Sequence, residues 1–151
     1  MTKAASLLPS CALAKSVAGG CAWCGAMLVG RRRTWCSEKC ANTFWKNHWW
    51  SLARRAAKVR DKYRCRQCGD APPKRPNRRA FRTEKTYKQA MRDWRAGRKK
   101  VRLEVNHREP CLGQHGTISC AHHLENLETL CAQCHRVHTA KFALDRKALT
   151  A

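Results

Sequence analysis

The chain has 151 residues, and its 32 Lys and Arg against 10 Asp and Glu give a formal net charge of +22 at pH 7. Such a charge attracts polyanions, so we expect a nucleic-acid partner. The length suits one domain or two small ones with a modest hydrophobic core, and the sequence lacks the run of about 18 apolar residues that would span a membrane.

Cysteine usage favours zinc over disulfides. Eight of the 11 cysteines fall into four close pairs, and the total is odd. Close pairs are the arrangement in which thiolates hold zinc. The first residues offer no apolar run of the length that a secretory signal needs. We therefore expect a reduced, cytoplasmic protein with no membrane partner. Cys11 has no cysteine nearby and is expected to be a free thiol.

A flexible lead is predicted at residues 1–20, followed by a zinc finger plus helix at residues 21–63. Two knuckle cysteines before Gly25, and two more that are four residues apart where a helix begins, resemble a treble-clef zinc finger. Four thiolates in a tetrahedron are a set that structural zinc prefers. The predicted ligands are Cys21, Cys24, Cys36 and Cys40.

One long helix is predicted from Ser37, as N-cap, to near Lys58. Apolar residues recur there in steps of three and four, which predicts a single buried stripe. The stripe is interpreted as protein core, with a platform for base stacking as the alternative. Trp50 lies off the stripe and is the better candidate for an exposed contact. The stripe consists of Ala41, Trp45, Trp49, Leu52, Ala56 and Val59.

A strongly basic insertion is predicted at residues 70–100. Its first part is rich in proline, which suits a linker, and a helix is predicted from Thr83, as N-cap, to about Ala96, with Gly97 ending it. The charges form either a solvated face or a contact to the DNA backbone. In the second case the contacts come from Arg78, Arg79, Arg82, Lys85, Lys88, Arg98, Lys99 and Lys100.

The last third of the chain predicts a strand, a second strand and a helix. Residues 101–107 alternate apolar and polar, which predicts a half-buried strand, and residues 127–130 predict a short second strand or a turn. A helix is expected from about Cys131 to Leu149. The loop between the strands holds several potential ligands, which either form a third zinc site or belong to an irregular loop: Cys111, His115, Cys120, His122 and His123.

Three motifs occur here in a fixed order. Asn106 and His107 end the predicted strand, Asn126 comes about twenty residues later, and His135 directly follows a Cys-x-x-Cys pair. This order resembles the HNH endonuclease family. The resemblance implies a small α+β zinc protein, with a ββα-metal, treble-clef-like nuclease domain at residues 64–151. It also implies a phage or bacterial protein with DNA as its substrate.

The resemblance assigns roles to these residues. His107 matches the general base, and Asn126 matches the asparagine that orients the base or joins the metal shell. His135 matches the metal-binding histidine of the helix, with Mg²⁺ or Mn²⁺, or alternatively Ni²⁺, as the catalytic ion. A second structural zinc, which would fix the geometry between strand and helix, is expected at Cys65, Cys68, Cys131 and Cys134.

One residue departs from the family pattern. Family members usually have aspartate where this chain has Asn106, and an amide oxygen ligates a divalent ion without bringing charge. Glu104, two residues earlier on the same strand face, is placed to compensate. A metal-dependent HNH endonuclease that hydrolyses phosphodiester bonds in DNA is the leading expectation. The alternative is a non-catalytic, zinc-containing protein that binds nucleic acid.

Overall fold

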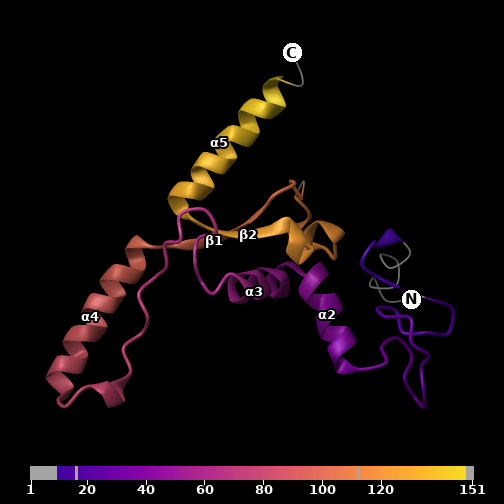
Figure 1. Ribbon diagram of the computed structural model, residues 1–151, viewed down its shortest axis with the longest axis horizontal. Helices are drawn as coiled ribbons and strands as arrows, with labels where there is room; N and C mark the ends of the chain where they lie inside the picture. Colours follow the sequence, from indigo (N-terminus) through magenta and orange to yellow (C-terminus); the bar gives the residue numbers. More distant parts are fainter. Residues whose placement is uncertain (1–9, 16, 112, 149–151) are drawn as a thin grey trace. The chain divides into compact units, whose positions relative to one another are not determined.

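The computed structural model describes residues 10–15, 17–111 and 113–148, without the side chains of residues 98–100, 114, 146 and 147. Within these ranges the chain is a small α+β protein with four α-helices and one two-stranded sheet (Figure 1). It forms two compact units, each made of two stretches of chain. The first unit is Met1–Ala57 with His107–Leu127, and the second is Lys58–Asn106 with Glu128–Ala151. Among the described helices, none combines the length and apolar character that crossing a bilayer requires.

Helix α2 (Glu38–His48) belongs to the first unit and begins at the predicted cap. The Ser37 hydroxyl accepts a hydrogen bond from the backbone N–H of Cys40 at 3.3 Å. This bond satisfies one of the free donors of the first turn, and Glu38 there complements the positive end of the helix dipole. The predicted role of Ser37 as N-cap is confirmed.

The single long helix predicted after Ser37 is wrong. The structure has two helices, α2 and α3 (Trp50–Arg60), and they are separated at Trp49. The backbone of Trp49 is extended (φ −105°, ψ 116°) and pairs with Ile118 in an isolated antiparallel bridge. A bridge to a residue so distant in the sequence cannot be inferred from helical periodicity.

The predicted apolar stripe is also wrong as a description of the core. Trp49, Leu52 and Val59 are exposed, whereas Phe44 is completely buried on α2. Phe44 packs against aromatic neighbours, with its ring centroid 5.0 Å from that of Trp35. The core of the first unit is therefore centred on the face of α2 that carries Phe44.

The predicted succession of strand, strand and helix lies in the second unit, except for His107 and Leu127, which belong to the first unit. Strand β1 (Leu103–His107) pairs with β2 (Leu127–Cys131), and α5 (Ala132–Ala148) follows β2 directly. Buried and half-buried residues alternate along β1, as predicted, while every residue of β2 is buried. Leu103 and Leu130 pack together with Cys65 and Cys131. The small core of this unit is thus closed around two of the predicted zinc ligands.

Helix α4 (Glu84–Lys100) also lies in the second unit, and its predicted cap is confirmed. The Thr83 hydroxyl accepts from Thr86 N at 3.2 Å. Gly97 does not end the helix, contrary to the prediction. Its lack of a side chain instead allows Pro73 to approach α4 closely. A Cβ at this position would lie 3.1 Å from Cγ of Pro73. Trp94 strengthens the same contact, since its indole N–H donates to the Pro73 carbonyl at 2.9 Å.

Candidate functional site

The four cysteines predicted to hold zinc in the second unit lie together. Cys65 and Cys68 come from a knuckle, Cys131 ends β2, and Cys134 lies in the first turn of α5. Their sulfur atoms are all within 4.8 Å of one another, and those of Cys68 and Cys131 are 3.7 Å apart. A tetrahedral zinc with four thiolates requires S–S distances of about 3.8 Å. This Cys₄ group could bind zinc, as expected.

The knuckle of the second unit prepares Cys65 for ligation. Its N–H donates to the Asp70 carbonyl at 2.7 Å, and Gly69 N–H donates back to the Cys65 carbonyl at 3.0 Å. Gly69 has a positive φ of 80°, a conformation that favours glycine. Burial raises the pKa of the Cys65 thiol, but backbone hydrogen bonds from Cys68, Cys131 and Gln67 outweigh burial and lower the pKa to about 6. A thiolate, the form that binds metal, is therefore favoured.

The first unit repeats this design. The ligand atoms of Cys21, Cys24, Cys36 and Cys40 also lie within 4.8 Å of one another. Cys21 N–H donates to the Ala26 carbonyl at 2.7 Å, and Gly25 N–H donates to Cys21 O at 2.9 Å. Backbone hydrogen bonds, led by that from Cys24, lower the pKa of Cys21 to about 6 against the opposing effect of burial. This second Cys₄ group could bind zinc as well.

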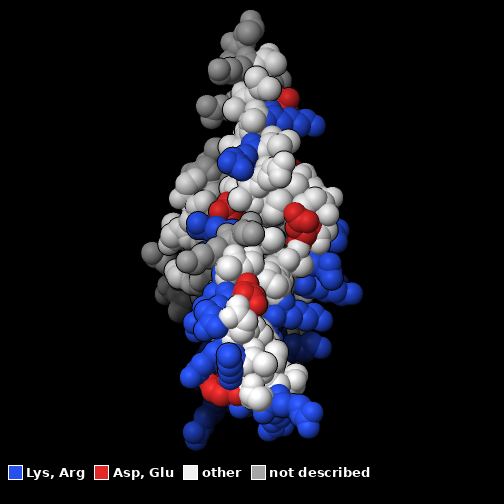
Figure 2. Space-filling model, turned by 90° about the vertical axis from the view of Figure 1, so that its left-hand side faces the viewer, with Lys and Arg blue, Asp and Glu red and all other residues white. Residues whose placement is uncertain are grey.

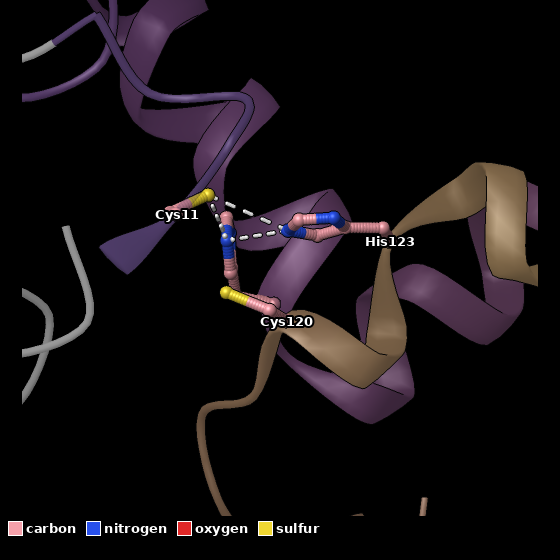
Figure 3. A group of neighbouring side chains, drawn as sticks. Cys11, Cys120 and His123 are labelled. Carbon is pink, nitrogen blue, oxygen red and sulfur yellow. Dashed lines mark hydrogen bonds between the residues drawn. The ribbon is translucent and has the colours of Figure 1, made fainter. Parts of the chain in front are cut away.

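A third group, of two cysteines and two histidines, was not predicted in this combination. Cys11, His48, Cys120 and His123 all lie in the first unit, with their ligand atoms within 4.8 Å of one another (Figure 3). Cys11 forms no disulfide, as expected. It is nevertheless buried, and its sulfur lies 3.2 Å from Nε2 of His48. Of the predicted 1–20 lead, residues 1–9 and 16 lie outside the described residues.

His107, the predicted general base, is buried in the first unit. Its Nε2 lies 3.0 Å from Nδ1 of His122, and its ring stacks on Trp50 with centroids 4.7 Å apart. Trp50 is therefore packed against a histidine, contrary to the exposed contact predicted for it. Burial, together with the nearby His122 and His115, lowers the pKa of His107 to about 4. The imidazole is neutral at pH 7.

His107 also belongs to a fourth potential metal group. Its ligand atom and those of Cys111 and His115 lie within 4.8 Å of one another. Cys111 Sγ lies 3.3 Å from Nε2 of His115. Of the five loop residues that suggested a third zinc site, Cys111 and His115 thus fall in one group, and Cys120 and His123 in another.

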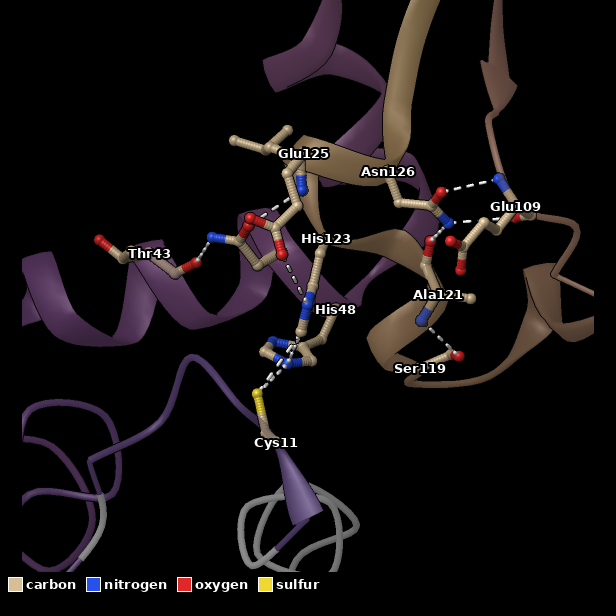
Figure 4. A network of polar contacts seen from close by, with 11 residues as sticks. Cys11, Thr43, His48, Glu109, Ser119, Ala121, His123, Glu125 and Asn126 are labelled. Carbon is tan, nitrogen blue, oxygen red and sulfur yellow. Dashed lines mark hydrogen bonds and ion pairs between the residues drawn. The ribbon is translucent and has the colours of Figure 1, made fainter.

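Asn126 closes the loop that follows His107. Its side-chain oxygen accepts from Glu109 N–H at 2.8 Å. Its amide N–H₂ donates to the carbonyls of Glu109 at 3.1 Å and of Ala121 at 2.9 Å (Figure 4). The sequence resemblance did not suggest this structural role, which holds both ends of the loop in place.

The other two predicted site residues, Asn106 and His135, lie in the second unit. Nδ1 of His135 is 2.6 Å from a carboxylate oxygen of Glu104. Asn106 Nδ2 is 3.1 Å from Nδ1 of His138, and Nε2 of His138 is 3.6 Å from Glu128. These are two separate sets of contacts on the same two strands and helix, and we call the five residues together the Glu–His group.

Sequence reasoning missed His138 and Glu128. His138 follows His135 by three residues on α5, so that both histidines lie on one helix face. That spacing was the available signal for His138. Glu128 carried no comparable signal, because it lies in a strand whose residues are all buried.

The basic insertion places cations on α4 and on the segment before it. Arg79, Arg82 and Lys85 are exposed, as are the other two predicted contacts with described side chains, Arg78 and Lys88. Figure 2 shows Lys and Arg side chains projecting to both sides in the lower part of the view, where α4 lies. Arg78 and Lys88 pair with Glu84 at 3.1 and 3.8 Å. The side chains of Arg98, Lys99 and Lys100 lie outside the described residues.

Comparison of the chain with protein-family models, with curated proteins and with solved structures finds no match.

Proposed function

We propose that this protein is a metal-dependent endonuclease of the HNH type, which hydrolyses phosphodiester bonds in DNA. The observation that supports this most strongly is the Glu–His group, which lies on β1, β2 and α5 in the same unit as a Cys₄ group. The zinc ligand Cys134 directly precedes His135 in the sequence. A zinc ion held by Cys134 would therefore fix the first turn of α5 and the direction of the His135 side chain.

The donors of the Glu–His group fit a divalent ion. Carboxylate and amide oxygens suit Mg²⁺ or Mn²⁺, while imidazoles suit Ni²⁺. Glu104, which lies next to His135, brings the negative charge that Asn106 lacks. Asn106 presents its amide nitrogen to His138, and a half-turn of the amide would present the oxygen instead. A bound ion would supply charge neutralisation at the phosphate and help to deprotonate the attacking water.

By the resemblance to the HNH family, His107 is proposed to act as the general base. A neutral imidazole can accept a proton, and burial keeps His107 neutral by lowering its pKa to about 4. The stacking on Trp50 and the contact with His122 hold the ring in one orientation. A fixed orientation lowers the entropic cost of the proton transfer.

The exposed cations of the basic insertion are proposed to bind the DNA backbone. Arg79, Arg82 and Lys85 extend from one short stretch of chain that includes the start of α4. Neutralisation of phosphates by such side chains releases counterions and supplies affinity without base recognition.

A non-catalytic zinc protein that binds nucleic acid is the second candidate function, and one observation favours it. His107 shares a potential metal group with Cys111 and His115. A metal ion ligated by His107 would occupy the ring that the nuclease requires as a base. The basic insertion serves either function equally.

Plasmid cleavage distinguishes the two functions. Incubation of supercoiled plasmid with the full chain and Mg²⁺, Mn²⁺ or Ni²⁺ should produce nicked or linear DNA, and omission of the divalent ion should prevent it. The zinc content is measured in parallel, so that loss of structural zinc is not mistaken for loss of the catalytic ion. Plasmid that is bound but left intact with every ion would refute the nuclease and support the binding protein.

A further inference from the structure

The group formed by Cys11, His48, Cys120 and His123 joins three distant stretches of the first unit. Cys11 precedes the predicted zinc finger, and His48 ends α2. Cys120 begins the short 3₁₀-helix Cys120–His122, and His123 follows it. Figure 3 shows the side chains of Cys11, Cys120 and His123 pointing toward one another. Cys11, His48 and His123 are all buried. Four ligand-bearing side chains thus meet where little water reaches them.

The polar contacts of the two Nδ1 atoms leave the Nε2 atoms of both imidazoles facing inward. His48 Nδ1 lies 2.8 Å from the Phe44 carbonyl, which only accepts, so Nδ1 carries the proton. His123 Nδ1 faces the Glu125 carboxylate at 3.8 Å, which favours a proton there too (Figure 4). In both rings Nε2 is then unprotonated. A hydrogen bond from the outer nitrogen to a carbonyl or carboxylate is the usual support of a metal-binding histidine.

The Nε2 lone pairs lie close enough together to share one cation. The two Nε2 atoms lie only 3.1 Å apart. The Cys11 sulfur lies 3.2 Å from Nε2 of His48 and 3.5 Å from Nε2 of His123. Two acceptors at this distance repel unless a proton or a metal ion lies between them. A tetrahedral zinc ion would separate its ligand atoms by about 3.3 to 3.8 Å, close to these values.

The charge balance also favours zinc. Two thiolates and two neutral imidazoles around Zn²⁺ form a centre with no net charge. Such a centre can be buried without the large desolvation cost of an isolated ion. Four protein ligands leave no open position, so the site suits a structural ion rather than a catalytic one.

We propose that Cys11, His48, Cys120 and His123 form a third structural zinc centre, which fastens the chain before the zinc finger and the 119–123 loop to the end of α2. Backbone contacts reinforce this fastening, since Ser119 N–H donates to the His48 carbonyl at 3.1 Å. The loop also carries His122, the hydrogen-bonding partner of His107. Zinc at this centre therefore holds His122 in position. The inference does not depend on nuclease activity.

Zinc stoichiometry tests the proposal. The full-length variants Cys11→Ala and Cys120→Ala, purified under reducing conditions, should each contain one zinc ion per molecule fewer than the wild type. The double variant should lose one zinc in total, because both residues serve the same ion. Unchanged zinc content in all three variants would overturn the proposal, and so would a loss of two zinc ions in the double variant.

X-ray absorption at the zinc edge provides a test that does not depend on folding of these variants. The Cys₄ groups supply sulfur alone, so a nitrogen contribution reports histidine ligation. The matched control, Cys111→Ala/His115→Ala/His135→Ala/His138→Ala, removes two ligands of the group that contains His107 and both histidines of the Glu–His group. The nitrogen contribution should persist in this control. Sulfur-only zinc in the control would contradict the proposed centre.

Discussion

Asp61 is a buried carboxylate that ties together separate segments of the second unit. Its side chain is 1% exposed and pairs with Arg60 at 2.9 Å. The same carboxylate accepts from the N–H of Thr129, in the middle of β2, at 3.0 Å. Burial by itself would raise the pKa of Asp61, but the hydrogen bonds and the charge of Arg60, with the bonds to Thr129, hold this pKa below its ordinary value.

Replacing Asp61 by Asn should therefore destabilise the second unit. We expect the free energy of unfolding at pH 7 to fall by about 1 to 3 kcal/mol, because a buried charge-assisted bond is lost. A lowered pKa means that the stabilisation is complete above the ordinary carboxyl pKa and is lost as the pH falls through the lowered one. Denaturant titrations should show the difference between wild type and Asp61→Asn shrinking in acid. Asp93→Asn, exposed on α4, is the control and should change stability little.

Substitutions at Asn106 and Glu104 change the charge of the Glu–His group. Asn106→Asp should lower the Mg²⁺ concentration for half-maximal plasmid cleavage, by about tenfold, because a carboxylate strengthens a hard-ion site. Glu104→Gln should raise this concentration, since it removes charge. Asn42→Asp makes the same change at an exposed position of α2 and should leave the metal dependence unchanged. An equal Mg²⁺ requirement in all four proteins would argue against an ion at the Glu–His group.

At the residue scale, the Cys₄ groups were predictable and the Cys₂His₂ group was not. Each Cys₄ group consists of two close pairs, and spacing within a pair is a local property of the sequence. In the Cys₂His₂ group, Cys11 and His48 each stand alone in the sequence, and only folding brings them to Cys120. Cys120 lies in a short 3₁₀-helix, whose sequence shows no periodicity that would link Cys120 to Cys11 or His48.

Helix α4 and the segment before it should account for much of the DNA affinity. The expected slope of log affinity against log salt is near −5 for about 6 phosphate contacts. The variant Arg79→Ala/Arg82→Ala/Lys85→Ala should make the slope shallower by up to about 3 and weaken binding. Fluorescence anisotropy with duplex DNA at several salt concentrations measures both quantities.

A matched variant separates this local effect from the loss of net charge. Arg54→Ala/Arg55→Ala/Lys62→Ala removes the same three charges from exposed positions outside the basic insertion. This variant should reduce the slope by less than Arg79→Ala/Arg82→Ala/Lys85→Ala does. Equal effects of the two variants would show that the overall charge, rather than the insertion, determines DNA binding.

The elements were predicted best where the determining signal was local. The caps Ser37 and Thr83 use side-chain bonds to residues three positions ahead. The break between α2 and α3 depends instead on the bridge from Trp49 to Ile118, which is absent from the helical pattern. Gly97 was misread for the same reason, because the approach of Pro73 explains it better than a helix end.

For the whole molecule, zinc should be a condition of folding. The buried cluster of the second unit is small, and Cys65 and Cys131 are part of it together with Leu103 and Leu130. Cys131→Ala should therefore remove one zinc and unfold the second unit, since metal binding and folding are coupled in such small cores. Hydrogen exchange along β2 and α5 measures this directly. Native protection of β2 in this variant would contradict a structural role for the zinc.

The strong positive charge and the strand–strand–helix order were both readable from the sequence, whereas the division into two units was not. Each unit combines stretches that are separated by many residues in the chain. Discontinuous units depend on tertiary contacts, whereas sequence patterns report only on residues that are near one another in the chain.

The most direct test of the central claim is plasmid nicking by the wild type, His107→Ala and His135→Ala in parallel, with zinc content and DNA affinity measured for each. The wild type should nick with Mg²⁺ or Mn²⁺. His107→Ala should lose cleavage while keeping DNA affinity and the zinc of both Cys₄ groups, because the base contributes to neither. His135→Ala should lose cleavage at low metal concentration and recover part of it at high concentration. Equal nicking by the wild type and His107→Ala, or no nicking by the wild type with any divalent ion, would contradict the account.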